Sequence, residues 1–468
     1  MIMFGENPGD ELHRVVKLAM DSGEAATVEE AMARFKGYRV GIRVGRHVAR
    51  SPSLQAAVLT AVNTARRCFL GGVEVAGALD APLLLPWPTC RTLGDAVHQL
   101  QGRVGTSLSP EIPCIQIGDA AKSSIEADDV LRRRFAVRAT FDGWSGGVVP
   151  LASNLRLGEH QECTPAGVLA GALAVSEAFQ FVRGGNPAAG RRDVGLSLWR
   201  PEPEVSWLES DALGPALDLL PCRLWLIGLG HLGQAYLWTL GLLPYADPAA
   251  VELMLQDFDT LTPANDSTSP LTTRALVGQK KARAMAAWCE TRGFRSVITE
   301  RRFSRDFRIA SDEPQVALAG VDNALARSAL EDAGFARVIE AGLGNGTTEY
   351  LAFQLHTFPG PQTARARWGR ALEAASPSRL LVNPAYAALA RAGVDECGLT
   401  LLAGRSVGAS FVGTAAATLV VAEAMRQVMG GPEYSLIDGS LRTPARRTAV
   451  PHERGSAAFN PGYTRVSQ

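Results

Sequence analysis

Residues Arg223–Asn265 read RLWLIGLGHLGQAYLWTLGLLPYADPAAVELMLQDFDTLTPAN, and this stretch decides the fold. Its first apolar run predicts a strand, which stops at Gly228, Gly230 and Gly233 in the pattern G-x-G-x-x-G. Apolar residues then recur at helical spacing, and a second apolar run follows. A strand, a glycine turn, a helix and a strand form the start of a nucleotide-binding βαβ unit.

The turn and the acid that follows the second strand have physical roles in such a unit. Glycine lets the backbone turn tightly and approach a phosphate, and the first turn of the helix offers unpaired N–H groups to anions. The second run ends in Asp257-Phe-Asp259. An acid at this place commonly holds the ribose of NAD. These features alone therefore indicate a nucleotide, with NAD as the default.

Three further polar residues argue against a dehydrogenase. Asn265 follows Asp259 by six residues, Lys281 lies in a G-x-x-K-A motif that opens a predicted helix, and Asp322 stands in a D-N pair after a later apolar run. A dehydrogenase has no need for a second acid, an amide and a lysine beside the phosphates. An adenylating enzyme needs them, because its chemistry is mostly positioning and charge neutralisation.

This pattern resembles the ThiF-like superfamily of ubiquitin-activating enzymes, over about residues 223–346 and again over 397–431. The resemblance implies an ATP and Mg²⁺ site. Its expected residues are Gly228, Gly230, Gly233, Asp257, Asp259, Asn265, Lys281 and Asp322.

Each side chain has an implied role in that site. Asp257 bonds the ribose, while Asp259 and Asp322 face magnesium, with Asp322 the preferred ligand. Asn265 donates to a phosphate oxygen, and Lys281 places a positive charge on the phosphates.

One position departs from the family pattern. The family has Arg three residues after the Asn and then Gln, whereas this chain has Thr268 and Ser269. If no other arginine replaces the missing charge, a non-catalytic ThiF-like scaffold becomes the alternative. The expected substitutes are Arg274 and, in the first half of the chain, Arg43, Arg46 and Arg50.

The first half of the chain repeats features of the second. Two alanine-rich segments correspond at one constant spacing, so that Gly167 matches Gly413 and Glu177 matches Glu423. Coincidence between two such helices is the alternative. We predict an α/β fold with two Rossmann-like ThiF-type adenylation domains, the N-terminal one degenerate and the C-terminal one active, forming a pseudo-dimer. The expected segments are 1–37 (helical), 38–185 (inactive domain), 186–206 (linker), 207–431 (active domain with an insertion at 356–396) and 432–468 (poorly ordered tail).

Composition narrows the setting. With 468 residues, the chain is long enough for two domains or more. The formal net charge of zero gives no indication of nucleic acid or anionic lipid as a partner. We expect no membrane span and a cytoplasmic location. Seven scattered cysteines without a C-x-x-C pair fit reduced thiols and argue against a structural zinc site.

The resemblance also implies a second step, in which the acyl group moves to a cysteine as a thioester. Cys397 is the expected nucleophile because it follows the last nucleotide motif and the insertion; a buried structural cysteine is the alternative, since Asp395 and Glu396 would raise its pKa. The implied partners are a ubiquitin-like protein with a C-terminal glycine and a conjugating-enzyme-like protein, as in bacterial conjugation operons, some of them antiphage. A sulfur-carrier adenylyltransferase and an NAD-dependent oxidoreductase are the alternatives, and a homodimer remains open.

Overall fold

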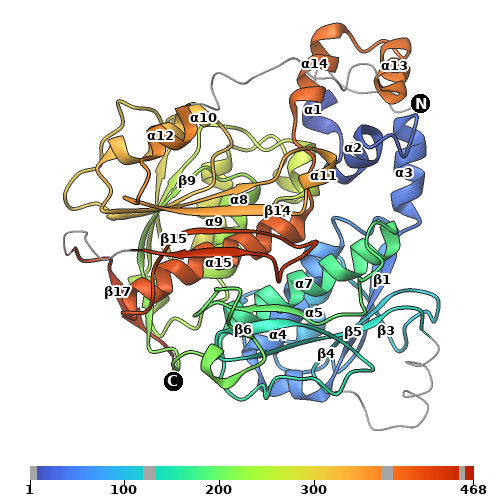
Figure 1. The fold of residues 1–468 in the computed structure, drawn as a ribbon, viewed down its shortest axis with the longest axis horizontal. Coiled ribbons are helices and arrows are strands. Elements are labelled where there is room, and N and C mark those ends of the chain that lie inside the picture. The colour runs from blue at the N-terminus through green and yellow to red at the C-terminus, as the bar shows by residue number, and fades with distance from the viewer. Residues whose placement is uncertain (1–7, 120–132, 370–382, 453–458, 468) are drawn as a thin grey trace.

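The computed structural model describes residues 8–119, 133–369, 383–452 and 459–467, and its two large sheets share one strand order (Figure 1). The first sheet runs β3-β2-β1-β4-β5-β6-β7. Its first five strands are parallel, and β6 and β7 are antiparallel to their neighbours. The strands are β1 (Arg39–Val44), β2 (Gly72–Gly77), β3 (Arg103–Gly105), β4 (Cys114–Ile117), β5 (Ala136–Asp142), β6 (Ser145–Pro150) and β7 (Val194–Ser197).

The second sheet repeats this order as β11-β10-β9-β12-β13-β14-β15 and adds β16 at its edge. Again the first five strands are parallel and the rest are antiparallel. The two-stranded pair β8 and β17 lies apart from both sheets. The strands are β8 (Leu219–Pro221), β9 (Arg223–Ile227), β10 (Glu252–Gln256), β11 (Arg295–Thr299), β12 (Val316–Ala319), β13 (Arg337–Leu343), β14 (Ala352–Phe358), β15 (Tyr434–Ser440), β16 (Thr448–Pro451) and β17 (Tyr463–Arg465).

Helices connect and cover these strands. The α-helices are α1 (Pro8–Glu11), α2 (Arg14–Asp21), α3 (Val28–Lys36), α4 (Pro52–Ala65), α5 (Leu93–Gln99), α7 (Thr164–Arg183), α8 (His231–Leu240), α9 (Lys281–Thr291), α10 (Ala324–Ser328), α11 (Gly346–Glu349), α12 (Ala364–Trp368), α13 (Pro384–Arg391), α14 (Glu396–Gly404) and α15 (Ser410–Val428). The 3₁₀ turns are η1 (Arg46–Arg50), η2 (Ser210–Ala212), η3 (Pro248–Ala250), η4 (Pro263–Ser267), η5 (Arg274–Leu276) and η6 (Leu330–Ala333).

The two long helices α7 and α15 occupy equivalent places in the two halves. α7 packs on α4, and a Cβ on Gly167 would lie 2.0 Å from the Ser53 carbonyl oxygen. α15 packs on α8, and a Cβ on Gly413 would lie 2.2 Å from Nε2 of His231. Both glycines therefore permit a close helix crossing, Gly167 near the start of α4 and Gly413 near the start of α8. α7 and α15 also contact each other between the two sheets (Figure 1).

The paired glutamates likewise perform the same task. The Glu177 carboxylate accepts hydrogen bonds from the Gly190 N–H and from Arg192, and so fixes the chain before β7. The Glu423 carboxylate accepts hydrogen bonds from Arg426 and from the N–H of Tyr434, which is the first residue of β15. A buried carboxylate requires such partners. The correspondence predicted from sequence spacing is therefore also a correspondence of structure.

α4 of the first half packs directly against the second half. The Trp238 indole N–H donates to Oγ1 of Thr60 at 3.0 Å, and the Ser410 hydroxyl donates to the Thr64 carbonyl at 2.8 Å. α7 is long and apolar enough to cross a membrane, but 89% of the relevant window is buried inside the protein. That burial is what its position in the shared core requires.

Three sequence-based expectations need correction. The tail at 432–468 is not simply irregular, because it supplies β15, β16 and β17. The linker at 186–206 contains β7, which pairs with β6. The insertion at 356–396 begins inside β14, and α12, α13 and the first residue of α14 lie within it. Residues 370–382 of this insertion lie outside the described residues.

The N-terminal helices form a small layer with α13 and α14, beside the two sheets (Figure 1). The Tyr386 hydroxyl lies 2.9 Å from an oxygen of the Asp21 carboxylate, and the Asn383 amide donates to the Met20 carbonyl at 2.8 Å. Arg405 forms an ion pair with Asp10 at 2.8 Å. The segment before the first sheet is thus tied to the segment that precedes α15.

Candidate functional site

The glycine turn lies where the strand order of the second sheet reverses. β9 is the central strand of the parallel part, with β10 on one side and β12 on the other. Connections after β9 and β12 therefore leave in opposite directions, and ligands of α/β sheets bind at such a point, beyond the carboxyl ends of the strands.

The three glycines of the turn meet different surroundings. Gly228 has a φ of +84°, which favours glycine. A Cβ on Gly233 would lie 1.9 Å from the Gly228 carbonyl oxygen, so this position requires glycine for close packing. A Cβ on Gly230 would meet nothing within 4 Å. Gly230 also stands at the N-cap of α8, where no side chain satisfies the helix terminus. The open side of the turn can therefore receive an anion.

Asp257 is locked onto this turn by both of its carboxylate oxygens. Oδ2 accepts the Leu229 N–H at 2.7 Å, and Oδ1 accepts the Asp259 N–H at 2.8 Å. Lys281 begins α9, and its Nζ lies 2.9 Å from Oδ2 of Asp259 and 3.9 Å from Oδ2 of Asp257. The two acids and the lysine predicted from separate motifs thus form one charged cluster against the glycine turn.

Asn265 lies on η4 with its side chain in a fixed orientation. Its Oδ1 accepts the Thr262 N–H at 2.8 Å and the Thr262 hydroxyl at 3.2 Å, which completes a capping box. Because the Thr262 N–H fixes the position of Oδ1, it also fixes the position of the amide nitrogen, which can donate hydrogen bonds. Within the described part of the chain this nitrogen forms no hydrogen bond. The predicted bond from Asn265 to a phosphate oxygen depends on this donor.

Asp322 follows β12 and lies beside the same turn. The preceding Gly320 donates its N–H to the Ile227 carbonyl at 2.9 Å, and Cγ1 of Val321 would lie 3.0 Å from a Cβ on Gly228. Asp322 itself is exposed. The neighbouring Asn323 caps α10 by accepting the Leu325 N–H. In the D-N pair, the Asn therefore has a structural role, and the Asp is the candidate ligand.

Asp259 and Asp322 could supply only a few of the ligands of a magnesium ion, so water would have to supply most of the others. Among the described residues, no group of three or more His, Cys, Asp or Glu side chains is arranged to hold a metal. Asp259 is occupied by Lys281, whereas Asp322 is exposed and available. Mg²⁺ in nucleotide sites commonly uses one or two carboxylates and takes its other ligands from water and phosphates. Asp322 fits that use, and Asp259 fits it only if Lys281 moves away.

The structure offers one further candidate for the substitute arginine, besides those expected from the sequence. Arg274 is exposed on η5, and the expected first-half arginines 43, 46 and 50 lie in or just after β1 at the equivalent end of the first sheet. The structure also brings Arg14, at the start of α2, into the electrostatic neighbourhood of Asp322. Nη1 of Arg14 is buried and has no hydrogen-bond partner among the residues that the structure describes.

Arg14 is held in place by its surroundings. Its backbone N–H donates to Oγ of Ser267 on η4 at 3.2 Å. The pKa of Arg14 falls to about 10, chiefly because of burial and then because of Arg405, while Asp10 and Asp322 raise it. Arg14 therefore stays charged at neutral pH. Sequence reasoning missed it because an arginine in an amphipathic N-terminal helix carries no signal of a site more than 200 residues away.

The cysteines divide clearly by exposure. Cys397 is exposed, Cys90 is partly buried, and the other five are buried. Burial raises the pKa of Cys68 to about 11 and the pKa values of Cys163 and Cys289 to about 12, so these thiols are inert at neutral pH.

Cys397 stands in the first turn of α14, whose N-cap Asp395 accepts the Gly398 N–H at 2.7 Å. α14 packs on α1, and α1 also contacts η4, which carries Asn265. One short helix therefore separates the exposed thiol's helix from the nucleotide loop. The alternative of a buried structural cysteine is wrong.

The equivalent position in the first half is filled by its own chain. Asp119 follows β4 as Asp322 follows β12, and its carboxylate accepts the His47 N–H at 3.0 Å. A Cβ on Gly45, which follows β1, would lie 2.1 Å from the Asp119 carbonyl oxygen. Backbone and carboxylate thus close the end of β1 where the second half has its open glycine turn. This gives a physical reason for the predicted inactivity of the first half.

Family descriptions and a curated relative match most of the chain. Family descriptions match residues 39–198 as "BilD N-terminal domain" and residues 220–431 as "BilD C-terminal domain". The bacterial E1-like protein BilD of Collimonas sp. (strain OK412) is 43% identical over 432 residues, which cover 92% of each chain.

Solved structures give partial superpositions. E. coli MccB aligns with a TM-score of 0.33 at 12% identity, covering 72% of this chain and 97% of MccB. E. coli tRNA N6-threonylcarbamoyladenosine dehydratase TcdA, solved with AMP, aligns with a TM-score of 0.30 at 14% identity, covering 45% and 86% of the two chains. The extent of the sequence match decides the assignment, and the chain belongs to the BilD family of bacterial E1-like proteins.

Proposed function

We propose that this protein activates the C-terminal glycine of a ubiquitin-like protein with ATP and magnesium, and then carries it as a thioester on Cys397. A conjugating-enzyme-like protein would receive the acyl group. The E1-like description of its relative supports this class of activity. The two halves act as a pseudo-dimer in which the second half holds the nucleotide and the first half supports it.

The observation that carries the proposal is the convergence of separate motifs on one turn. Asp257 accepts the Leu229 N–H, and Nζ of Lys281 lies 3.9 Å from the same carboxylate oxygen. The segment of Asp322 packs against Gly228 from the other side. A site that binds a dinucleotide needs only the turn and the first acid. The remaining charges suit a site in which negative charge develops on phosphates.

In the first step, a carboxylate oxygen of the partner attacks the α-phosphorus of ATP. The bond from that phosphorus to the oxygen bridging the β-phosphate breaks, and pyrophosphate leaves. The N–H groups of the glycine turn and the Asn265 amide orient the phosphates, and Lys281 places a positive charge near them. Magnesium, when bound, neutralises phosphate charge beside Asp322.

Arg14 completes this site from outside the second half. Arg14 as a group is close enough to Asp322 for that acid to raise its pKa, and its buried Nη1, without a partner among the described residues, is suited to donate to a phosphate oxygen. An uncompensated buried donor is costly unless a ligand satisfies it. Arg14 thus supplies the cation that the family pattern expects at Thr268.

In the second step, the thiolate of Cys397 attacks the acyl carbon of the adenylate. The bond between that carbon and the phosphate oxygen breaks, AMP leaves, and the ubiquitin-like protein remains on sulfur. The exposure of Cys397 at a helix N-terminus supports this role.

The test is ATP–pyrophosphate exchange driven by the ubiquitin-like partner. We expect wild-type exchange and a loss of at least about a hundredfold in kcat/KM for Asp322→Ala and Arg14→Ala, as for removal of a group that stabilises transition-state charge. Arg283→Ala, at an exposed ion pair on α9, serves as the matched control. Exchange that survives Asp322→Ala would contradict the assigned role of that acid.

Two alternatives give different outcomes. A sulfur-carrier adenylyltransferase would still transfer its cargo when Cys397 is replaced by alanine. An NAD-dependent oxidoreductase would be stabilised by NAD and not by ATP in a thermal-shift assay. ATP binding without exchange would leave a non-catalytic scaffold.

A further inference from the structure

The loop that follows Asn265 is held mainly from the other half of the protein. This loop, residues 266–272, contains Thr268 and Ser269, where the family pattern has Arg and Gln, and both are buried. It has 3₁₀ geometry only through Ser267. Its backbone carbonyls therefore need partners that no regular helix or strand provides.

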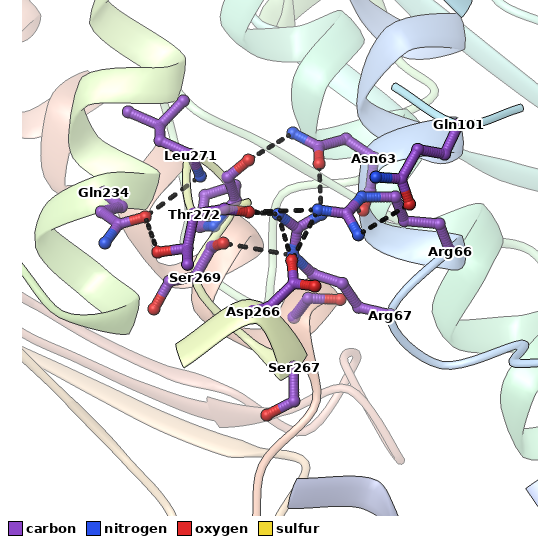
Figure 2. Close-up of polar contacts among 12 residues, drawn as sticks. Asn63, Arg66, Arg67, Gln101, Gln234, Asp266, Ser267, Ser269, Leu271 and Thr272 are labelled. Atoms are coloured by element: carbon purple, nitrogen blue, oxygen red, sulfur yellow. Dashed lines mark hydrogen bonds and ion pairs between the residues drawn. The ribbon is translucent and has the colours of Figure 1, made fainter. Parts of the chain in front are cut away.

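α4 of the first half supplies those partners (Figure 2). Arg67, with a side chain only 1% exposed, donates to the Ser269 carbonyl at 3.1 Å and to the Thr272 carbonyl at 3.0 Å. It also donates to Oδ1 of Asn63 at 2.6 Å, and the Asn63 amide donates to the Pro270 carbonyl at 3.1 Å. The fixed fork of a guanidinium suits several carbonyls at once.

Arg66 adds an ion pair to the same loop. It lies 2.8 Å from Oδ1 of Asp266 and donates to the Thr272 carbonyl at 3.2 Å. His13 lies close to Asp266, but burial lowers its pKa to about 4, so it is neutral at physiological pH. The charge of Asp266 is therefore balanced by the two arginines, since Arg67 lies 3.7 Å from it.

The opposite side of the loop is tied to the glycine turn. Oε1 of Gln234, on α8, accepts the Leu271 N–H at 3.1 Å and the Thr272 hydroxyl at 3.0 Å (Figure 2). Its amide nitrogen donates to the Leu229 carbonyl at 3.1 Å. At the start of the loop, the Ser269 N–H donates to the Asn265 carbonyl at 2.8 Å. Contacts thus run without a break from α4 to the nucleotide site.

We infer that Arg66 and Arg67, with Asn63, are positioning residues for adenylation, through which the first half sets the place of Asn265 and of the glycine turn. This inference rests on the proposed function. The first half thereby holds, by its own arginines, a loop that in the family pattern carries its own arginine. The hydrogen bonds of both guanidinium groups go to this loop, to Asn63 and to Gln101, and the loop begins directly after Asn265.

A steady-state measurement on the full-length chain tests this. We would prepare Arg66→Gln, Arg67→Met and Asp266→Asn, with Arg66→Lys as a conservative variant. The control is Arg192→Gln, which removes another interior ion pair, with Glu177, away from this loop. For each variant we would measure kcat and KM for ATP in partner-driven pyrophosphate exchange, the Kd for ATP by calorimetry, and the Tm.

We expect kcat/KM for ATP to fall about tenfold for Arg66→Gln and about a hundredfold for Arg67→Met, because small displacements of positioned groups have effects of this size. Arg66→Lys should recover most of the loss. The control should lower Tm without changing kcat/KM of the folded protein.

Two results would overturn the inference. One is a loss of Tm in Arg66→Gln and Arg67→Met, like that of the control, with wild-type kcat/KM and Kd for ATP measured well below Tm. The other is Arg66→Lys behaving no better than Arg66→Gln. Absence of exchange in the wild-type protein would instead refute the proposed function, and the ATP affinities of the variants would still report on positioning.

Discussion

Replacing Gly233 and Gly230 by alanine, one at a time, separates the structural glycine of the turn from the ligand-facing one. A Cβ at Gly233 would lie 1.9 Å from the carbonyl oxygen and 2.9 Å from the carbonyl carbon of Gly228. Both contacts are with backbone, so no side chain can rotate away. The turn or α8 must move by more than 1 Å, as judged against an ordinary contact of about 3.5 Å.

The expected cost follows from that clash. Overpacking a tight interior site typically costs about 1–3 kcal/mol and occasionally more. Because Gly233→Ala strikes backbone that is already at positive φ, we expect the upper end, about 3 kcal/mol. For a domain of about 200 residues this lowers Tm by roughly 6–12 °C.

Gly230→Ala should behave differently. Its added methyl meets nothing within 4 Å, although its ψ of −141° lies outside the regions that alanine prefers and adds a strain on the order of 1 kcal/mol. The N-cap change costs at most about 1 kcal/mol. The methyl nevertheless enters the space over the turn that the phosphates would occupy. We therefore expect a smaller loss of Tm than in Gly233→Ala and an ATP affinity at least tenfold weaker.

Differential scanning fluorimetry and calorimetric titration with ATP would make the comparison. Wild-type stability in Gly233→Ala would show that the turn is not packed as described. Wild-type ATP affinity in Gly230→Ala would show that the phosphates do not lie over this residue, and the anion-binding reading of the turn would fail.

Three further outcomes follow from the site. Asp257→Asn should lower the free energy of unfolding by about 1–3 kcal/mol, because an amide cannot accept both N–H donors; Asp259→Asn, at a half-exposed pair, should cost at most about 1 kcal/mol in the same urea titration. Cys397→Ala should abolish a thiol-sensitive partner adduct on non-reducing gels and leave pyrophosphate exchange intact; a persisting adduct would exclude this cysteine. The unfolded chain protonates His13 near pH 6.5 but the folded chain only near pH 4, so lowering the pH from 7.5 to 5.5 should cost about 1 kcal/mol that His13→Gln does not lose.

The sequence predicted the unit of strand, glycine turn, helix and strand well because its signals are local. An apolar run, three glycines and the acids after each strand determine one another over short spacings, and parallel strands bring their carboxyl ends together. Thus Asp257, Lys281 and the segment of Asp322 meet at one turn, although they come from different motifs. The paired glutamates were predictable for the same reason, since each anchors the strand after its own helix.

The tail and the supporting arginines were not predictable in this way. β15 reads YSLIDGS, which is a weak strand signal, and it is a strand because β14 offers it an open edge. Arg66 and Arg67 follow a helix, where a basic residue is usually a solvated C-terminal cation. Their acceptors lie about 200 residues later in the chain. Only the packing of the two halves brings them together.

The two halves share one topology but differ in what fills the equivalent strand ends. Asp119 of the first half closes the end of β1 by accepting the His47 N–H, whereas Asp322 of the second half is exposed beside an open turn. Arg67 is buried just after the far end of α4, where closing the end of β1 does not require it. A buried guanidinium is costly unless every donor is used, and here its acceptors belong to the loop beside the nucleotide site. Arg67 therefore joins the first half to the loop beside the glycine turn of the second, whereas the end of β1 is closed by its own chain.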